Sequence, residues 1–232
     1  MEATRPHTRL AGRSCAAFLV GLAVTLHAPL VAAQAEQRAL VTAATGTLAD
    51  FLAIPSMAWL QGNVGRAKAV VIAPKITKAG LVVGGSGGRA VVVARDPQTG
   101  RWIGPAFYTL TTASVGLQVG VSVSEVVMLV MTDAGLEGLL KNSFQMGGNL
   151  AIAVGPVSRN ARTDLIADIV SFSRSQGVYV GVDLTGTVVA LSDDWNRLYY
   201  GRSVEASDIL VRQTVHNEHA SQLRRLLARA SR

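Results

Sequence analysis

Residues 66–95 form a basic, glycine-rich and strand-like block that contains no acidic residue. The block reads RAKAVVIAPKITKAGLVVGGSGGRAVVVAR, and short β-branched stretches in it are separated by glycine or proline, as is typical of β-strands. Its basic residues are Arg66, Lys68, Lys75, Lys78, Arg89 and Arg95. The block therefore favours a β-rich fold with a surface of one charge sign, although a run of apolar strands also leaves little room for acids.

The spacing of apolar residues predicts helices at both ends of the chain and strands between them. Residues 36–50 fit a first helix, and Pro55 fits the first turn of a second one; the two would either pack on the sheet or lie on a membrane surface. Strands are expected at residues 70–73, 80–84, 89–95, 106–111, 115–131, 149–154, 166–173 and 178–184, and turns at Pro74-Lys75, residues 84–88 and residues 96–100.

Two aspartates and many glycines complete the predicted fold. Asp133 and Asp193 are expected to cap short helices, and a helical tail is expected from Ser207 onward. Glycines recur inside the predicted strands, where they relieve crowding in a sharply coiled sheet. We therefore predict an α+β fold, with a strongly twisted, barrel-like, mainly antiparallel sheet and short helices at both ends.

The first 33 residues have the pattern of an export signal. Three arginines precede the apolar run CAAFLVGLAVTL, and small residues follow it, so that cleavage is expected after Ala33 or after Ala35. The apolar run is shorter than the roughly 20 residues that a membrane-spanning helix needs. We expect a signal peptide at residues 1–33, a single domain at residues 34–232, and an exported protein that is periplasmic or envelope-associated.

Loss of this leader limits the chemistry of the remaining chain. The only cysteine, Cys15, would leave with it, which excludes disulfides, thiolate catalysis and cysteine metal sites. Of the four histidines only His216 and His219 would remain, three residues apart, and a solvated helix face is favoured for them over a metal site. The sequence has no GxSxG motif. We therefore expect neither an enzyme nor a cofactor.

The glycine cluster at residues 84–88 does not fit a nucleotide-binding loop. A phosphate-cradling loop is followed by a helix, whereas Ala90-Val91-Val92-Val93-Ala94 follows here and is strand-like. The whole chain carries a formal charge of +7, and the three arginines and one glutamate of the leader account for +2, which leaves +5. Because aromatic residues are few and do not alternate with the basic ones, nucleic acid is not expected as a partner.

Six segments carry a resemblance to a known family. In chain order they are AKAVVIAPKITKAGLVVGGSGGRAVVVARD, WIGPAFYTLTTASVGLQVG, VVMLVMTDAGLEGLL, VGPVSRNA, FSRSQGVYVGVDLTG and NRLYYG. Together they closely resemble the SYLF domain, from about Ala53 to about Gly201. The resemblance implies a lipid-binding module for acidic phospholipids, which include phosphoinositides in eukaryotic members, and for actin in some fungal members. It implies no catalytic reaction, and an exported protein would meet neither actin nor phosphoinositides.

These observations predict a non-enzymatic protein that binds anionic phospholipid headgroups at a membrane surface. Lys68, Lys75 and Lys78, helped by Arg66 and Arg89, would supply the charges, and neighbouring apolar residues would insert. The alternative is a structural cell-envelope protein that binds a protein or an acidic polymer. The arginine-rich tail after Ser207 lies beyond the resemblance, and its stripe of Leu223, Leu226 and Leu227 fits a membrane surface, a partner helix or an ordinary helix end equally well.

Overall fold

The fold is known from a computed structural model, which describes residues 34–80, 83–115, 120–148, 150–155, 167–175, 178–179 and 184–232. The predicted signal peptide lies outside these residues. The described helices are α3 (Ala35–Ala53), α4 (Ala58–Asn63), α5 (Asp133–Leu140), α6 (Asp193–Tyr200), α7 (Ala206–Leu210) and α8 (Ser221–Ala230), with single 3-10 turns at Pro55–Met57, Val64–Arg66 and Glu218–Ala220. The described strands are β1 (Ala69–Gly80), β2 (Val83–Arg95), β3 (Trp102–Val115), β4 (Gly120–Val130), β5 (Ser143–Gln145), β6 (Ile152–Val154), β7 (Ile169–Ser175), β8 (Val178–Tyr179) and β9 (Val188–Leu191).

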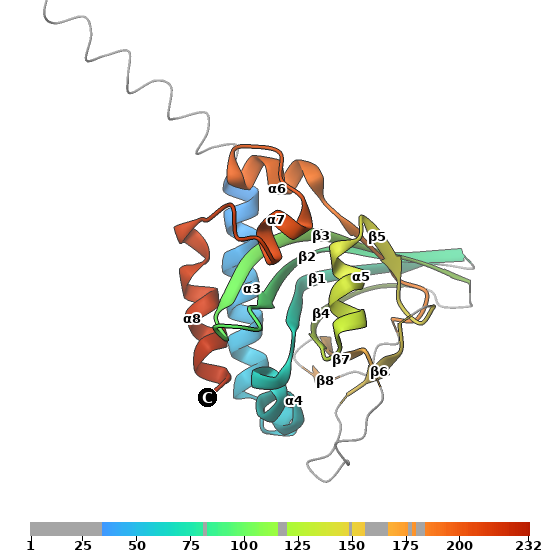
Figure 1. The fold of residues 1–232 in the computed structure, drawn as a ribbon. Coiled ribbons are helices and arrows are strands. Elements are labelled where there is room, and N and C mark those ends of the chain that lie inside the picture. The colour runs from blue at the N-terminus through green and yellow to red at the C-terminus, as the bar shows by residue number, and fades with distance from the viewer. Residues whose placement is uncertain are drawn as a thin grey trace, which may run out of the picture. The chain divides into compact units, whose positions relative to one another are not determined.

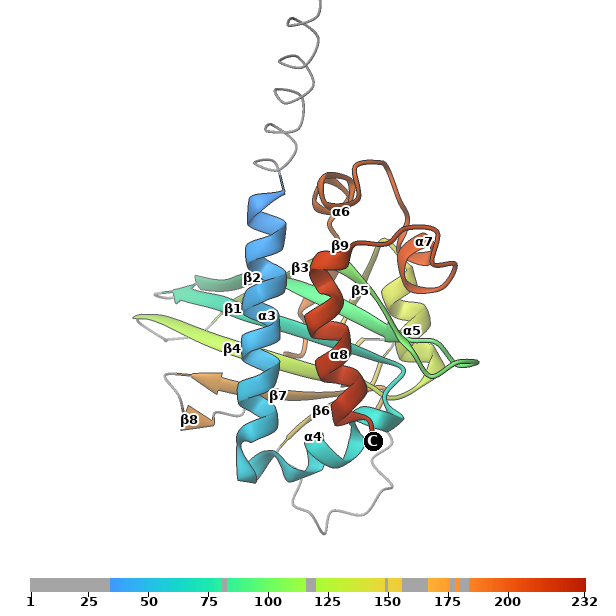
Figure 2. The same cartoon turned by 90° about the vertical axis from the view of Figure 1, so that its left-hand side faces the viewer.

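These strands form one curled sheet, which confirms the predicted α+β class. The strand order is β5-β9-β3-β2-β1-β4-β7-β6, and β8 pairs with β7. Each of these pairs is antiparallel except β6 with β7. Helices α3 and α8 lie side by side across one face of the sheet, which we call the α3 face, and α5 covers the other, the α5 face (Figures 1 and 2).

Each face of the sheet has its own hydrophobic core. On the α3 face, Val70, Ile72 and Val91 of the sheet pack with Leu48 of α3 and Leu227 of α8. The α5 face has a second core, whose members include Val71, Val92, Met128, Leu139 and Ile209. Alternate residues of β1 and β2 thus serve opposite cores, as the two-residue period of a strand requires. Because α3 buries its apolar residues in the first core, packing on the sheet is the alternative that the structure shows for this helix.

The central strands are longer than predicted because two expected turns are absent. The register of β1 shifts against both β2 and β4 between Ile72 and Ile76, which makes Pro74 part of a β-bulge rather than a turn. A bulge tolerates proline in a central strand because the missing N–H is not needed there. Residues 84–88 are likewise not a turn: they pair with β1 on one side and β3 on the other, inside β2.

Other predicted boundaries are corrected in the same way. Val115 ends β3, and the strand expected at residues 115–131 begins at Gly120. The N-cap of α5 is Thr132, whose hydroxyl oxygen accepts from the Gly135 N–H at 3.1 Å, and the N-cap of α6 is Ser192. Asp133 and Asp193 therefore lie in the first turns of their helices and do not cap them. Residues 149, 166 and 180–183 of the later predicted strands lie outside the described part of the chain.

Candidate functional site

The four central strands run past the edge of helix α3 and form a projecting end of the sheet (Figure 2). We define the sheet end as residues 75–80 of β1, 84–89 of β2, 109–113 of β3 and 121–124 of β4. In the sequence, Asp96 is the single acidic residue between Asp50 and Glu125, and it lies in the turn between β2 and β3 at the opposite end of these strands. The sheet end itself therefore contains no carboxylate side chain.

Exposed cations and exposed valines share the sheet end. Lys75 lies directly opposite Arg89 in the β1–β2 register, so both side chains project from the same face of the sheet. Lys78 projects from the other face, because it stands two residues after Ile76, a member of the α5-face core. All three cations are exposed. Val121, at 74% exposed, lies beyond them toward the tip of the sheet end.

Arg89 is held in place by helix α6. Its guanidinium lies 4.0 Å from the centre of the Trp195 ring and donates to the Ser192 Oγ at 3.3 Å. A cation over an aromatic face at an exposed site contributes about 0.5–1 kcal/mol. The stacking fixes the direction of the guanidinium while the side chain stays exposed. Arg89 is therefore a positioned positive charge, and neither Trp195 nor this contact was predicted from the sequence.

The other two predicted cations lie far from the sheet end. Lys68 pairs with Asp133 at 2.8 Å, and Arg66 donates to the Asn63 Oδ1 at 3.3 Å. Seven residues of strand separate Lys68 from Lys75, which corresponds to roughly 23 Å. The structure thus brings together Lys75 and Arg89, places Lys78 on the opposite face of the same sheet end, and leaves Arg66 and Lys68 at the other end of β1.

Two acidic side chains at and near the border of the sheet end share one arginine. Glu125, at the border of the sheet end, accepts from Arg174 at 2.6 Å and from the Thr47 hydroxyl at 2.9 Å. Arg174 also binds Asp50 of α3 at 2.9 Å. This network ties α3 to β4 and β7. The sheet end is thus free of acids in its own residues but flanked by carboxylates, at Glu125 and, next to the Arg89–Ser192 contact, at Asp193 and Asp194 of α6.

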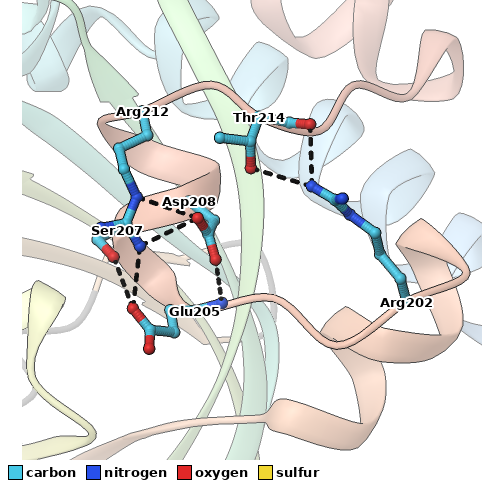
Figure 3. A network of polar contacts seen from close by, with 6 residues as sticks. All are labelled: Arg202, Glu205, Ser207, Asp208, Arg212 and Thr214. Carbon is cyan, nitrogen blue, oxygen red and sulfur yellow. Dashed lines mark hydrogen bonds and ion pairs between the residues drawn. The ribbon is translucent and has the colours of Figure 1, made fainter.

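The arginines of the C-terminal tail differ in whether they form ion pairs and hydrogen bonds. Figure 3 shows Arg212 bound to Glu205 and Asp208, both at 3.0 Å, and Arg202 bound to Thr214. Asp208 also accepts from the Glu205 N–H and closes the cap of α7; this backbone hydrogen bond, helped by Arg212, lowers the pKa of Asp208. Arg225 and Arg229, by contrast, form no ion pair with any described residue. Of the leucine stripe, Leu223 and Leu227 are buried in the α3-face core and Leu226 is partly buried against it, so the stripe is mainly a core contact.

The histidines and buried tyrosines are the candidate catalytic groups among the described residues. The described residues contain no cluster of three histidine, cysteine, aspartate or glutamate side chains that would hold a metal ion. His216 contacts Glu218 at 2.8 Å, while His219 contacts the Arg38 carbonyl at 3.0 Å, so the two rings are engaged separately. Burial raises the pKa of Tyr108, Tyr199 and Tyr200, which keeps these phenols neutral.

No single described helix is long and apolar enough to cross a bilayer, although α3 and the Pro55–Arg66 segment together meet that test with a 91° bend between them.

Comparison with known proteins identifies the family. The sequence model of the Ysc84 family, described as "Las17-binding protein actin regulator", matches residues 111–230, just over half of the chain. The chain belongs to the Ysc84 family, whose domain is the SYLF domain. The match continues through α8, so the prediction that the tail lies beyond the resemblance is wrong.

Relatives of this Ysc84-family chain carry the same domain within longer proteins. The chain is 31% identical over 169 residues to human SH3 domain-containing YSC84-like protein 1, which covers 71% of this chain and 49% of that protein. It is 32% identical over 168 residues to the Schizosaccharomyces pombe SH3 domain-containing protein PJ696.02, covering 69% of this chain and 39% of the relative. LAS seventeen-binding protein 3 of Saccharomyces cerevisiae is 29% identical over 152 residues, covering 62% and 33%. The chain thus spans about half the length of these relatives or less, and its family membership indicates a binding module.

Proposed function

We propose that this SYLF domain binds anionic phospholipid headgroups at a membrane surface, and that the sheet end makes the contact. The observation that carries the proposal is the presence of three exposed cations, Lys75, Lys78 and Arg89, and of exposed valines on a sheet end whose own residues include no acid. Cations at a surface and apolar side chains beyond them are the two elements that peripheral membrane binding needs.

The expected free energy of membrane binding corresponds to weak, reversible binding. Each basic residue near an anionic surface contributes about 1 kcal/mol, so the three cations supply about 3 kcal/mol. Insertion of a valine side chain adds about 1.5 kcal/mol, and Val121 and Val123 are 74% and 43% exposed. The sum of about 5–6 kcal/mol corresponds to a dissociation constant on the order of 0.1 mM. Binding of this strength depends on the fraction of anionic lipid and on salt.

Charge reversal at the sheet end should abolish vesicle binding. The variant Lys75→Glu/Lys78→Glu removes about 2 kcal/mol of attraction and adds repulsion, so partitioning onto phosphatidylglycerol-containing vesicles should fall at least about 30-fold in co-sedimentation. Both side chains are exposed, so the fold should persist. Binding by the unchanged protein should also weaken as salt is raised, because exposed charges are screened beyond about 10 Å at 0.1 M ionic strength.

The matched control is Arg66→Glu/Lys68→Glu, which makes the same change of charge at the other end of β1. We expect it to bind vesicles nearly as the unchanged protein does. If the two variants lose vesicle binding equally, the net charge of the protein drives binding and no particular site is involved. If the control alone loses vesicle binding, the site lies at Arg66 and Lys68. If no vesicle composition binds the protein, the alternative of an envelope protein with a protein or acidic-polymer partner replaces the lipid proposal.

We further propose that the protein is exported and acts in the periplasm or at the envelope. The support is the leader pattern, in which three arginines precede an apolar run and small residues. N-terminal sequencing of the protein from an extracytoplasmic fraction should give Gln34 or Glu36 as the first residue. Recovery of the intact chain from the membrane fraction would mean that the leader is an anchor.

A further inference from the structure

A groove runs between helices α3 and α8 on the solvent side of the α3 face. The two helices lie side by side in Figure 2, and the groove between them encloses about 550 Å³. Its lining residues are Thr42, Thr45, Gly46 and Ala49 of α3, and Gln222, Arg225, Leu226 and Arg229 of α8. Each wall spans eight residues of helix, whose ends are about 10 Å apart. The groove is therefore long enough to contact two turns of another helix.

The α3 wall of the groove contains an exposed glycine that the domain itself does not require. Gly46 lies in the middle of α3, and a Cβ added there would meet no atom within 4 Å. A glycine inside a helix costs about 1 kcal/mol of stability relative to alanine, so an internal packing reason would be expected and is absent. Without a side chain at this position, the backbone of α3 stays open to the close approach of another element.

The charges of the groove have one sign. Residues 39–49 of α3 include no charged side chain, so that wall is neutral. The opposite wall presents Arg225 and Arg229, one helical turn apart and without an ion pair to any described residue. Their four-residue spacing corresponds to about 6 Å along the helix axis. Carboxylates spaced four residues apart on a docked helix have the same rise and would face both arginines at once.

We infer that the α3–α8 groove binds an acidic amphipathic helix of a partner protein. The apolar side of that helix lies over Gly46, Ala49 and Leu226, and two of its carboxylates, four residues apart, pair with Arg225 and Arg229. This is the helix-in-groove mode of recognition, with the charge pairs setting the register and orientation of the docked helix. The groove uses none of the cations assigned to the membrane contact, so one domain would hold a lipid surface and a protein helix at separate places.

The direct probe is a synthetic 18-residue helical peptide with glutamates four residues apart and an alanine- and leucine-rich opposite side. A second peptide carries lysine in place of each glutamate. We expect fluorescence anisotropy with the full mature chain to show binding of the glutamate peptide at least tenfold tighter than the lysine peptide. The variant Arg225→Glu/Arg229→Glu should invert this preference, because the charge pairs are then complementary to the lysine peptide.

Two further variants test the place of binding. Gly46→Trp projects a large side chain into the groove and should abolish binding of the glutamate peptide, whereas Gly46→Ala should keep it. Arg66→Glu/Arg101→Glu, which alters two arginines outside the groove, should also keep it. Vesicle binding by Gly46→Trp should be unchanged, which both shows that the variant folds and separates this inference from the lipid proposal.

Three outcomes would overturn the inference. The first is equal binding of the two peptides, or none, by the unchanged chain. The second is a glutamate-peptide affinity that neither Gly46→Trp nor the double arginine variant changes. The third is concentration-dependent self-association in sedimentation velocity that Gly46→Trp removes, which would make a second copy of the chain the occupant.

Discussion

Replacement of Gly88 by alanine is expected to destabilise the protein by about 3 kcal/mol or more, whereas the same replacement at Gly87 is expected to be neutral or slightly stabilising. A Cβ at Gly88 would run into the backbone carbonyl oxygen of Lys75, beside the bulge at Pro74 in the neighbouring strand. Backbone on both sides has to move to make room, and the paired strands β1, β2 and β4 resist that movement. At Gly87 the Cβ would lie 3.6 Å from the Leu110 carbonyl oxygen, an ordinary contact.

Urea unfolding of the two variants, followed by circular dichroism, measures the difference. The pair is matched because the substitution is chemically the same and the positions are adjacent in β2. At Gly87 the alanine also reduces the conformational freedom of the unfolded chain, which is worth about 0.4–1 kcal/mol. Similar unfolding midpoints for both variants would mean that the strand opposite Gly88 lacks the bulge.

Replacement of Leu227 by alanine is expected to cost about 2–5 kcal/mol, and removal of α8 is expected to prevent folding. Leu227 is fully buried in the α3-face core, and α8 is fixed at both ends. Arg224 donates to the Gly104 carbonyl at 2.9 Å, and Trp102 donates through its indole N–H to the Ser231 Oγ at 3.0 Å. The helix is thus a structural layer of the domain and not an appended tail.

The neighbouring leucine supplies the control for this prediction. Leu226 is half-buried at the edge of the groove, so Leu226→Ala should cost clearly less than Leu227→Ala in a thermal unfolding experiment. Each 1 kcal/mol corresponds to a shift of about 2–4 °C in Tm for a domain of this size. A larger loss at Leu226 than at Leu227 would mean that α8 is rotated relative to the sheet.

Local patterns in the sequence predicted the class of the fold but not the contacts between distant segments. The apolar alternation of β1 and β2 was sufficient to assign strands on both sides of Pro74. Whether Pro74 makes a turn or a bulge depends on the pairing with β2 and β4, which no local pattern contains. The glycines at residues 84–88 were assigned to a turn for the same reason, since the need for Gly88 arises from a carbonyl oxygen thirteen residues earlier in the chain.

At the candidate site, too, local sequence patterns could not predict contacts between distant segments. The sequence identified the acid-free basic block, yet it could not separate Lys68 from Lys75, because Lys68 finds its partner Asp133 far away in the chain. The exposed Val121 had a usable signal: in VSVS, valine alternates with serine, as in a strand with one apolar face. The stripe of Leu223, Leu226 and Leu227 correctly indicated an amphipathic helix. What covers that stripe is decided by the sheet and α3, which the helix sequence does not specify.

The central claim, that the sheet end contacts an anionic membrane, is tested most directly at Val121. In a Cys15→Ser background, a single cysteine at Val121 can carry an environment-sensitive fluorophore, and a cysteine at Val211, which is 50% exposed and outside the sheet end, provides the comparison. On addition of phosphatidylglycerol vesicles, the account predicts a blue shift in the emission of the Val121 label, none at Val211, and loss of the shift in Lys75→Glu/Lys78→Glu. Equal shifts at both labels, or a shift at Val211 alone, would contradict it.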